Sequence, residues 1–201
     1  MTIEDQPFRG ILIAISAVIF PILIYHRLKS QKTREKLDRR QEGLFILLTL
    51  RPVGLVFLAT FFAYLIDPHT MAWASIDLPR PARWLGIALC VIGSSLLFWT
   101  LRSLGKNLTD TVVTRRDHAL VTRGPYRWVR HPFYVSVTLF LAGVSLAAAD
   151  WFFLVGGAAV LVLIGIRTRT EEAKLEERFG EAYRAYRERT GRFFPRLGAR
   201  R

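Results

Sequence analysis

The segment between residues 133 and 166 constrains the fold most strongly. Asp150, near its middle, is its only charged residue. A segment of this length and composition indicates two apolar helices joined by a turn at the aspartate. Arg-His-Pro-Phe-Tyr at residues 130–134 marks its start, and a group of arginines and glutamates at residues 167–172 follows it. A helical hairpin would bring these two polar groups together, because both ends of a hairpin emerge on the same side.

The rest of the chain also alternates apolar blocks with basic segments. Its 201 residues are 51% hydrophobic and carry a formal net charge of +13. Membrane spans with basic loops explain this combination, which water-soluble domains seldom show. We predict an all-α, polytopic membrane protein with five transmembrane helices. The predicted spans are residues 10–25, 44–66 with an interruption at Arg51-Pro52, 84–101, 133–149 and 151–166.

The distribution of charge predicts the orientation of these spans. Segments 26–43 and 102–132 hold seven basic residues each, and the region from residue 167 holds eleven, which leaves four of the 29 elsewhere. With five spans, all three segments lie on one side of the membrane. The positive-inside rule then places the N-terminus outside and the C-terminus in the cytosol.

Other features narrow the class of protein. We interpret the chain as one domain, with three spans in residues 1–101 and a loop, a hairpin and an amphipathic helix in residues 102–201. The first span lacks a positive n-region and a cleavage site, which predicts that it is retained. The lone Cys90 excludes an internal disulfide and a cysteine-based metal site. No nucleotide-binding or zinc motif is present, so we predict no metal. The basic charge is divided among membrane-adjacent loops, so we predict no nucleic-acid partner.

Three regions carry candidate functional residues. The loop 105–132 predicts either a ligand wall or a connector held on anionic lipid by its arginines. His131 precedes a proline suited to a first helical turn, where free N–H groups favour an anion; the alternative is an interfacial anchor. Arg167 and Glu171, spaced i,i+4, share a helical face that either holds a carboxylate and an ammonium group or is simply solvated.

Two further features leave alternatives open. Arg51 lies within an apolar block, which favours either a functional site or a snorkelling side chain. An apolar stripe predicts a helix that folds the tail along the membrane surface, either shielding a site or lying there without a catalytic part. The stripe comprises Leu175, Phe179, Tyr183 and Tyr186, and Gly191 is predicted to end the helix.

The second half of the chain carries an ordered set of motifs that resembles a known family. The set comprises Gly124-Pro125-Tyr126, Arg130-His131-Pro132-x-Tyr134, Arg167-x-x-x-Glu171-Glu172-x-x-Leu175, Phe179-Gly180-x-x-Tyr183-x-x-Tyr186 and Pro195. It resembles the isoprenylcysteine carboxyl methyltransferase family and is similar to related membrane phospholipid methyltransferases. The resemblance covers residues 105–196 and implies an all-helical membrane enzyme that uses S-adenosylmethionine in a cytosolic C-terminal pocket.

The resemblance also implies roles for individual residues. Arg167 matches the arginine beside the substrate's reacting group, and Glu171 matches a cofactor-contacting glutamate, so both are catalytic candidates. Whether Thr114, Glu172 or Arg51 joins the site stays open. The remaining cofactor-binding candidates are His118, Ala119, Leu120, Val121, Tyr126, His131, Pro132, Phe133 and Tyr134.

The predicted function is methyl transfer from S-adenosylmethionine to a lipophilic acceptor within the bilayer. A carboxylate such as a prenylcysteine-like group needs orientation and removal from water, but no general base. An amine or thiol acceptor would also need a proton acceptor, for which Glu171 or Glu172 is available. The alternatives are an NADPH-dependent reductase of the sterol-reductase type and a non-catalytic membrane adaptor. The sequence does not indicate the oligomeric state.

Overall fold

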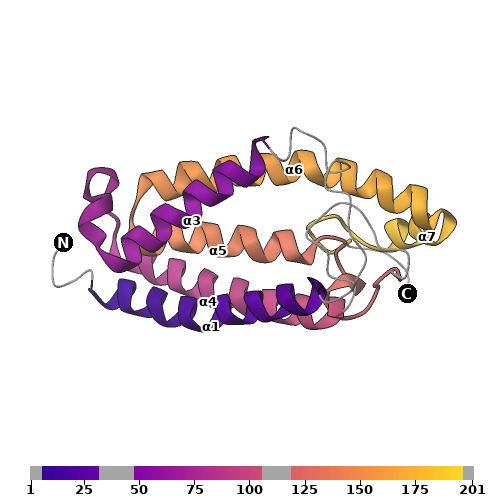
Figure 1. The fold of residues 1–201 in the computed structure, drawn as a ribbon, viewed down its shortest axis with the longest axis horizontal. Coiled ribbons are helices and arrows are strands. Elements are labelled where there is room, and N and C mark those ends of the chain that lie inside the picture. Colours follow the sequence, from indigo (N-terminus) through magenta and orange to yellow (C-terminus); the bar gives the residue numbers. More distant parts are fainter. Residues whose placement is uncertain (1–5, 32–47, 106–118, 197–201) are drawn as a thin grey trace.

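Long helices lying roughly along one axis build the molecule (Figure 1). We describe the protein from a computed structural model, in which residues 6–31, 48–105 and 119–196 are described. The elements in chain order are α1 (Gln6–Gln31), α3 (Leu50–Ile66), the 3₁₀-helix η3 (Pro68–Ala74), α4 (Arg80–Leu104), the 3₁₀-helix η5 (Gly124–Arg127), α5 (Pro132–Ala148), α6 (Trp151–Phe179) and α7 (Glu181–Arg189). This confirms the all-helical prediction for the described part of the chain.

Three of these helices are long and apolar enough to cross a bilayer by themselves. They are α1, α4 and α6, and a fourth span is possible if α3 and η3, which meet at 119°, form one broken span. The apolar helix α5 has 17 residues, fewer than the roughly 20 that a span ordinarily needs. A membrane protein with three or four candidate spans is therefore supported, and the count of five stays a prediction.

Helix α3 begins close to the expected interruption at Arg51-Pro52. These two residues lie in the first turn of α3, and the Arg51 side chain is exposed. Proline is tolerated there because the first N–H groups of a helix have no intrahelical acceptor. A helix therefore begins within the predicted block, next to Arg51-Pro52; residues 44–47 of that block lie outside the described residues.

The predicted hairpin is present as α5 and α6. Ala149, between them, has a left-handed backbone with φ of 52°. Asp150 then caps α6, because its carboxylate accepts a hydrogen bond of 3.1 Å from the backbone N–H of Phe153. The lone charged residue of the apolar segment thus starts the second helix of the hairpin.

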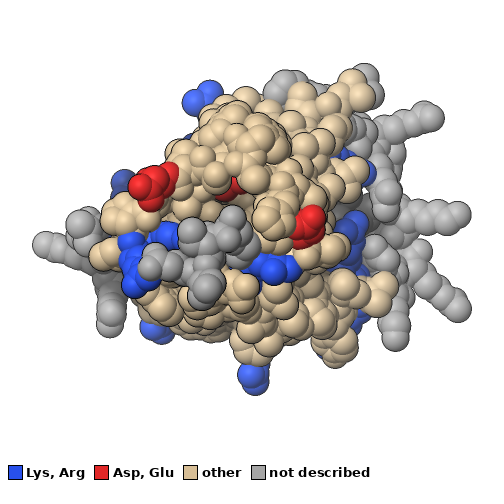
Figure 2. Space-filling model, turned by 90° about the vertical axis from the view of Figure 1, so that its left-hand side faces the viewer, with Lys and Arg blue, Asp and Glu red and all other residues tan. Residues whose placement is uncertain are grey.

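Two arginines link neighbouring helices at the end of the bundle where this hairpin turns. Arg9 of α1 donates to the backbone oxygens of Leu65 and Ile66, at 2.7–3.1 Å, where α3 ends. The buried Arg83 of α4 donates to Ala147 near the end of α5, at 3.1 Å. Each guanidinium satisfies carbonyls that lack an intrahelical partner and favour a cation. Figure 2 looks onto this end and shows separate basic and acidic side chains on a surface formed mostly by other residues.

Helices α4 and α5 pack backbone to backbone through glycines. A Cβ at Gly86 would lie 2.5 Å from the backbone nitrogen of Ala147, and one at Gly143 would lie 2.6 Å from the sulfur of Cys90. Small residues at such contacts let membrane helices approach closely. The buried Cys90 therefore packs as a small apolar side chain at the α4–α5 contact.

This close contact predicts a sharp difference between two glycine substitutions. Gly86→Ala should destabilise the protein by about 1–3 kcal/mol, because the new methyl group requires α5 to move. Gly165→Ala in α6 is the matched control, since nothing lies within 4 Å of its Cβ position and alanine favours a helix. Thermal unfolding in detergent measures both effects. Equal melting temperatures for the two variants would contradict the close packing.

The end of α6 differs from the expected fifth span. The helix does not stop at residue 166 but continues through Phe179, and the polar residues 167–179 extend the apolar helix. Gly180, with φ of 51°, then separates it from α7. The predicted stripe from Leu175 to Tyr186 is therefore divided between two helices. Tyr183 and Tyr186 are the buried residues of α7.

Candidate active site

The polar ends of the hairpin meet, as the sequence predicts. His131 is the N-cap residue of α5, and Tyr134 lies in the first turn of that helix. The Tyr134 hydroxyl donates a hydrogen bond of 2.7 Å to Oε2 of Glu171, in the polar extension of α6. Residues 37 positions apart in the sequence are thus joined where both helices leave the apolar region.

Two more predicted residues lie near this bond. Burial raises the pKa of Tyr126, in η5, above its ordinary range, and the charge of the neighbouring Glu171 raises that pKa further. The Arg167 guanidinium is close enough to the Tyr134 hydroxyl to interact with it electrostatically. Two tyrosines, an arginine and a carboxylate therefore gather in one place. We call Tyr126, Tyr134, Arg167 and Glu171 the tyrosine–glutamate cluster.

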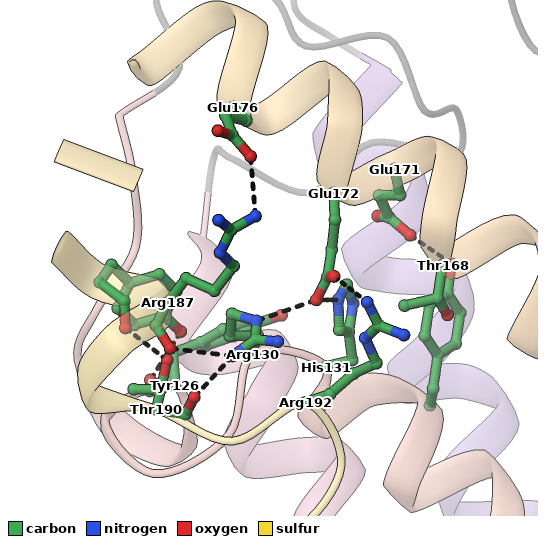
Figure 3. Close-up of polar contacts among 12 residues, drawn as sticks. Tyr126, Arg130, His131, Thr168, Glu171, Glu172, Glu176, Arg187, Thr190 and Arg192 are labelled. Atoms are coloured by element: carbon green, nitrogen blue, oxygen red, sulfur yellow. Dashed lines mark hydrogen bonds and ion pairs between the residues drawn. The ribbon is translucent and has the colours of Figure 1, made fainter. Parts of the chain in front are cut away.

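Glu172 forms a second cluster directly beside the first. Its side chain is buried, and Oε1 accepts 2.9 Å from Nε of Arg130 and lies 3.1 Å from Nε2 of His131. Oε2 accepts from Nη2 of Arg192. Figure 3 shows Glu172 extending from α6 toward all three partners. A buried carboxylate requires such partners, because an unpaired buried charge is costly.

The Glu172 cluster holds the tail of the chain against the start of α5. The backbone N–H groups of Arg130 and His131 donate to the oxygens of Gly191 and Arg192, at 2.9 and 3.1 Å. Nη1 of Arg130 also donates to the oxygen of Thr190 at 2.5 Å. A side chain at Gly191 cannot fit, because its Cβ would lie 1.7 Å from the oxygen of Phe194. The tail is therefore bound through both backbone and side chains.

Helix α7 closes over η5. The Tyr186 hydroxyl donates 2.7 Å to the backbone oxygen of Tyr126. Tyr183 is fully buried, and Tyr186 is 4% exposed. The chain segment that carries Tyr126 is thus covered by the aromatic face of α7. This covering shields one side of the tyrosine–glutamate cluster from water.

The remaining predicted cofactor residues are less closely connected to the cluster. Pro132 is buried, and Phe133 packs between the two groups of core residues. Ala119 is exposed, and Leu120 and Val121 are half-buried in the segment before η5. His118 and Thr114 lie outside the described residues. The structure therefore brings together Tyr126, His131, Tyr134, Arg167 and Glu171.

The position of Glu172 had a signal in the sequence. The buried residues of α6 recur every three or four positions at Phe153, Gly157, Val160, Ile164, Thr168 and Glu172. Glu172 therefore continues the face of the helix that packs inside the protein. A carboxylate on that face needs a basic partner. The partner Arg192 lies 20 residues away, beyond the α6–α7 break, and no local pattern points to it.

A basic hollow of about 330 Å³ opens beside the Glu172 cluster. Its lining consists of Arg130, Arg187, Thr190, Gly191, Arg192, Phe194 and Arg196. Glu171 and Tyr134 are not part of this lining. Within the described residues, no group of three His, Cys, Asp or Glu side chains is arranged to hold a metal ion.

The fold and site together define the class as an all-helical integral membrane protein with a polar site at the end of a helical hairpin. Residues 85–177, from α4 to α6, match the model of the isoprenylcysteine carboxyl methyltransferase (ICMT) family. This match covers a little under half of the chain and confirms the resemblance found in the motifs.

Individual relatives agree with this resemblance. The uncharacterized protein YpbQ of Bacillus subtilis is 27% identical, over 58% of this chain and 74% of its own length. The protein-S-isoprenylcysteine O-methyltransferase of Schizosaccharomyces pombe is 33% identical over 50% of this chain and 44% of its own length. The enzyme of the same name from Homo sapiens is 31% identical over 53% of this chain and 39% of its own length. The alignments thus span less than half the length of these two enzymes.

A solved structure supports the fold. It is that of the eukaryotic intramembrane Ras methyltransferase ICMT, with a TM-score of 0.56 at 19% identity. The similarity covers 93% of this chain and 68% of the other. At this level of identity the comparison concerns the arrangement of helices and not the chemistry.

Proposed function

We propose that this protein transfers a methyl group from S-adenosylmethionine to the carboxylate of a lipophilic acceptor, such as a prenylcysteine-like group in the bilayer. The tyrosine–glutamate cluster carries the proposal. It lies at the end of an apolar helical hairpin and within the region that matches the ICMT family. A lipid-soluble acceptor and a water-soluble methyl donor would meet at such a boundary.

The side chains present suit the charges of S-adenosylmethionine. Its ammonium and sulfonium groups are cations, which favour a carboxylate and the faces of aromatic rings. Glu171 supplies the carboxylate, and Tyr126, Tyr134 and His131 supply the rings. His131 is buried, with its ring stacked on Tyr134 at 5.6 Å between ring centres. When bound, the cofactor supplies an electrophilic methyl group. The family resemblance adds residues 118–121 and Pro132-Phe133 to its binding set.

The protein's own residues would then orient the acceptor and exclude water. Arg167 can hold a carboxylate with its planar fork, which leaves the attacking oxygen directed toward the methyl group. A carboxylate acceptor carries no proton that must be removed. Orientation and desolvation are therefore the main contributions required of the chain. Helix α7, closed over η5, supports the second of these contributions.

Calorimetric titration of the detergent-purified protein tests this function. We expect saturable binding of S-adenosylhomocysteine and none of NADPH. Binding of NADPH alone would favour a reductase, and binding of neither would favour a non-catalytic adaptor. Methyl transfer from labelled cofactor to carboxylate, amine and thiol analogues with a prenyl chain would identify the acceptor.

Glu171 allows a more specific test of the cofactor site. Glu171→Ala should weaken S-adenosylhomocysteine binding by about 1.5–3 kcal/mol, the value typical of a hydrogen bond to a charged group, and leave the protein folded. Glu177→Ala, on the same helix and exposed, should bind like the wild type. Unchanged affinity of the folded Glu171 variant would remove this residue from the cofactor site.

We also propose five spans with the N-terminus outside and the basic segments in the cytosol. A cysteine at Ser75, in the loop 67–83, should react with an impermeant thiol reagent added to intact cells. A cysteine at Thr122, in the loop 102–132, should react only after the cells are lysed. Both side chains are exposed, whereas the native Cys90 is fully buried. Labelling of the Thr122 variant from outside would overturn this topology.

A further inference from the structure

A second hollow lies at the end of α4, beside η5. Its volume is about 480 Å³, and its lining consists of Phe98, Trp99, Arg102, Ser103, Arg123 and Gly124. None of these residues belongs to the tyrosine–glutamate cluster or the Glu172 cluster. Apart from Gly124, which begins the Gly-Pro-Tyr motif, none of them belongs to the motifs that carry the family resemblance. The hollow is therefore lined by a different set of residues from the proposed active site.

A close backbone contact shapes this hollow. Gly124 has φ of 62°, and a Cβ there would lie 2.1 Å from the hydroxyl of Ser103. Only glycine lets the chain approach α4 so closely with this backbone. Beside it, the rings of Trp99 and Trp128 meet edge to face at 5.5 Å, and Arg127 lies 3.9 Å over the Trp128 ring. These contacts fix the positions of Gly124 and Trp99 at the wall of the hollow.

One side of the hollow is basic. Arg102 lies in the last turn of α4, and Arg123 is the N-cap residue of η5. Both side chains are exposed. Within the described residues, no carboxylate forms an ion pair with either guanidinium. Two arginines facing a common space suit an anion with several oxygens, because a guanidinium binds phosphate through two parallel hydrogen bonds.

The other side of the hollow is apolar and continuous with the outer face of α4. Phe98 is 43% exposed and Trp99 is 44% exposed. Val91, which is 48% exposed, lies seven residues before Phe98 and therefore on the same side of this candidate span. Arg102 follows Phe98 by one helical turn. An apolar track along a membrane helix thus ends at two arginines and a tryptophan, as expected at a membrane interface.

We propose that this hollow binds the phosphate headgroup of an anionic membrane phospholipid, whose acyl chains lie along the exposed face of α4. The headgroup phosphate would accept hydrogen bonds from Arg102 and Arg123. A soluble phosphate would use the same two arginines but would leave the apolar wall of Phe98 and Val91 uncovered. Basic pockets at the ends of transmembrane helices are suited to anionic lipids. This site does not depend on the proposed methyltransferase activity.

Native mass spectrometry of the full chain in detergent tests the proposal. With phosphatidylglycerol added, we expect one lipid to remain bound at activation energies that remove phosphatidylcholine. The double variant Arg102→Gln/Arg123→Gln should bind phosphatidylglycerol at least about tenfold more weakly, since it loses two charge-assisted contacts. The matched control is Arg169→Gln/Arg189→Gln, which removes the same charge from two exposed arginines outside the hollow.

The outcomes separate the possible sources of binding. Equal weakening in the two double variants would overturn the proposal, because it would indicate general attraction to a basic protein. Displacement of the lipid by inorganic phosphate would identify a site for soluble anions instead. If the double variant does not fold, the single variants Arg102→Gln and Arg123→Gln are compared with Arg169→Gln. Wild-type lipid retention by both single variants would then overturn the proposal.

Discussion

Replacing Glu172 with alanine should lower the free energy of unfolding by about 3–5 kcal/mol, the cost expected when one partner of a buried ion pair is removed. Arg130 and His131 would lose their shared carboxylate while their side chains remain 9% and 5% exposed. The tail would lose the contact between Arg192 and Glu172. We therefore expect a lower midpoint of denaturation in detergent and earlier proteolysis near residue 192.

Glu176 provides the control for this prediction. It lies one turn beyond Glu172 on α6 and forms two ion pairs of 2.8 Å, with Arg184 and Arg187. These ion pairs are exposed to solvent, and water screens their charges, so they contribute little to the free energy of unfolding. Glu176→Ala should therefore change stability far less than Glu172→Ala. Similar losses in both variants would mean that the Glu172 cluster is not a special support of the fold.

Arg167→Lys should reduce methyl-transfer turnover by about 100-fold while cofactor binding is retained. Lysine keeps the charge but lacks the planar fork that fixes the orientation of the carboxylate while one of its oxygens attacks. A small misplacement of a reacting group is enough for a loss of this size. The measurement combines transfer of a labelled methyl group to a prenylcysteine analogue with titration of S-adenosylhomocysteine.

Arg169→Lys is the matched control for this substitution. Arg169 lies two residues further along the same helix, and its side chain is exposed. Positions two apart on a helix do not share a face, so this variant should retain nearly all of the turnover. Near-normal turnover of the Arg167 variant would leave the acceptor-binding residue unassigned. Loss of cofactor binding in that variant would instead place Arg167 in the cofactor site.

The neighbours Glu171 and Glu172 illustrate how one helix serves two purposes. Glu171 is half-buried and accepts a hydrogen bond from Tyr134, whereas Glu172 is buried among three basic side chains. Successive residues of a helix are about 100° apart around its axis, which directs the two carboxylates to different surroundings. The supporting cluster thus lies directly beside the residues proposed to act in catalysis.

Several properties of this protein were determined by the sequence alone. The apolar segment around Asp150 predicted a hairpin, because a long apolar segment in a membrane satisfies its backbone groups only as helices. The hairpin in turn predicted that the polar group at residues 130–134 meets the group at residues 167–172, because its two ends must emerge together. The ordered motifs from Gly124 to Pro195 predicted the family. All of these follow from periodicity, local composition and motif order.

Other properties were decided only by the tertiary structure. The sequence left open whether Glu172 joins the site, and its partner Arg192 comes from a tail that returns after the break at Gly180. The hollow likewise joins Arg102, near the end of α4, to Arg123, which lies 21 residues later. Such contacts depend on where the chain returns in space. Helical periodicity reports only which face of one element is buried, and therefore does not determine which distant residues meet it.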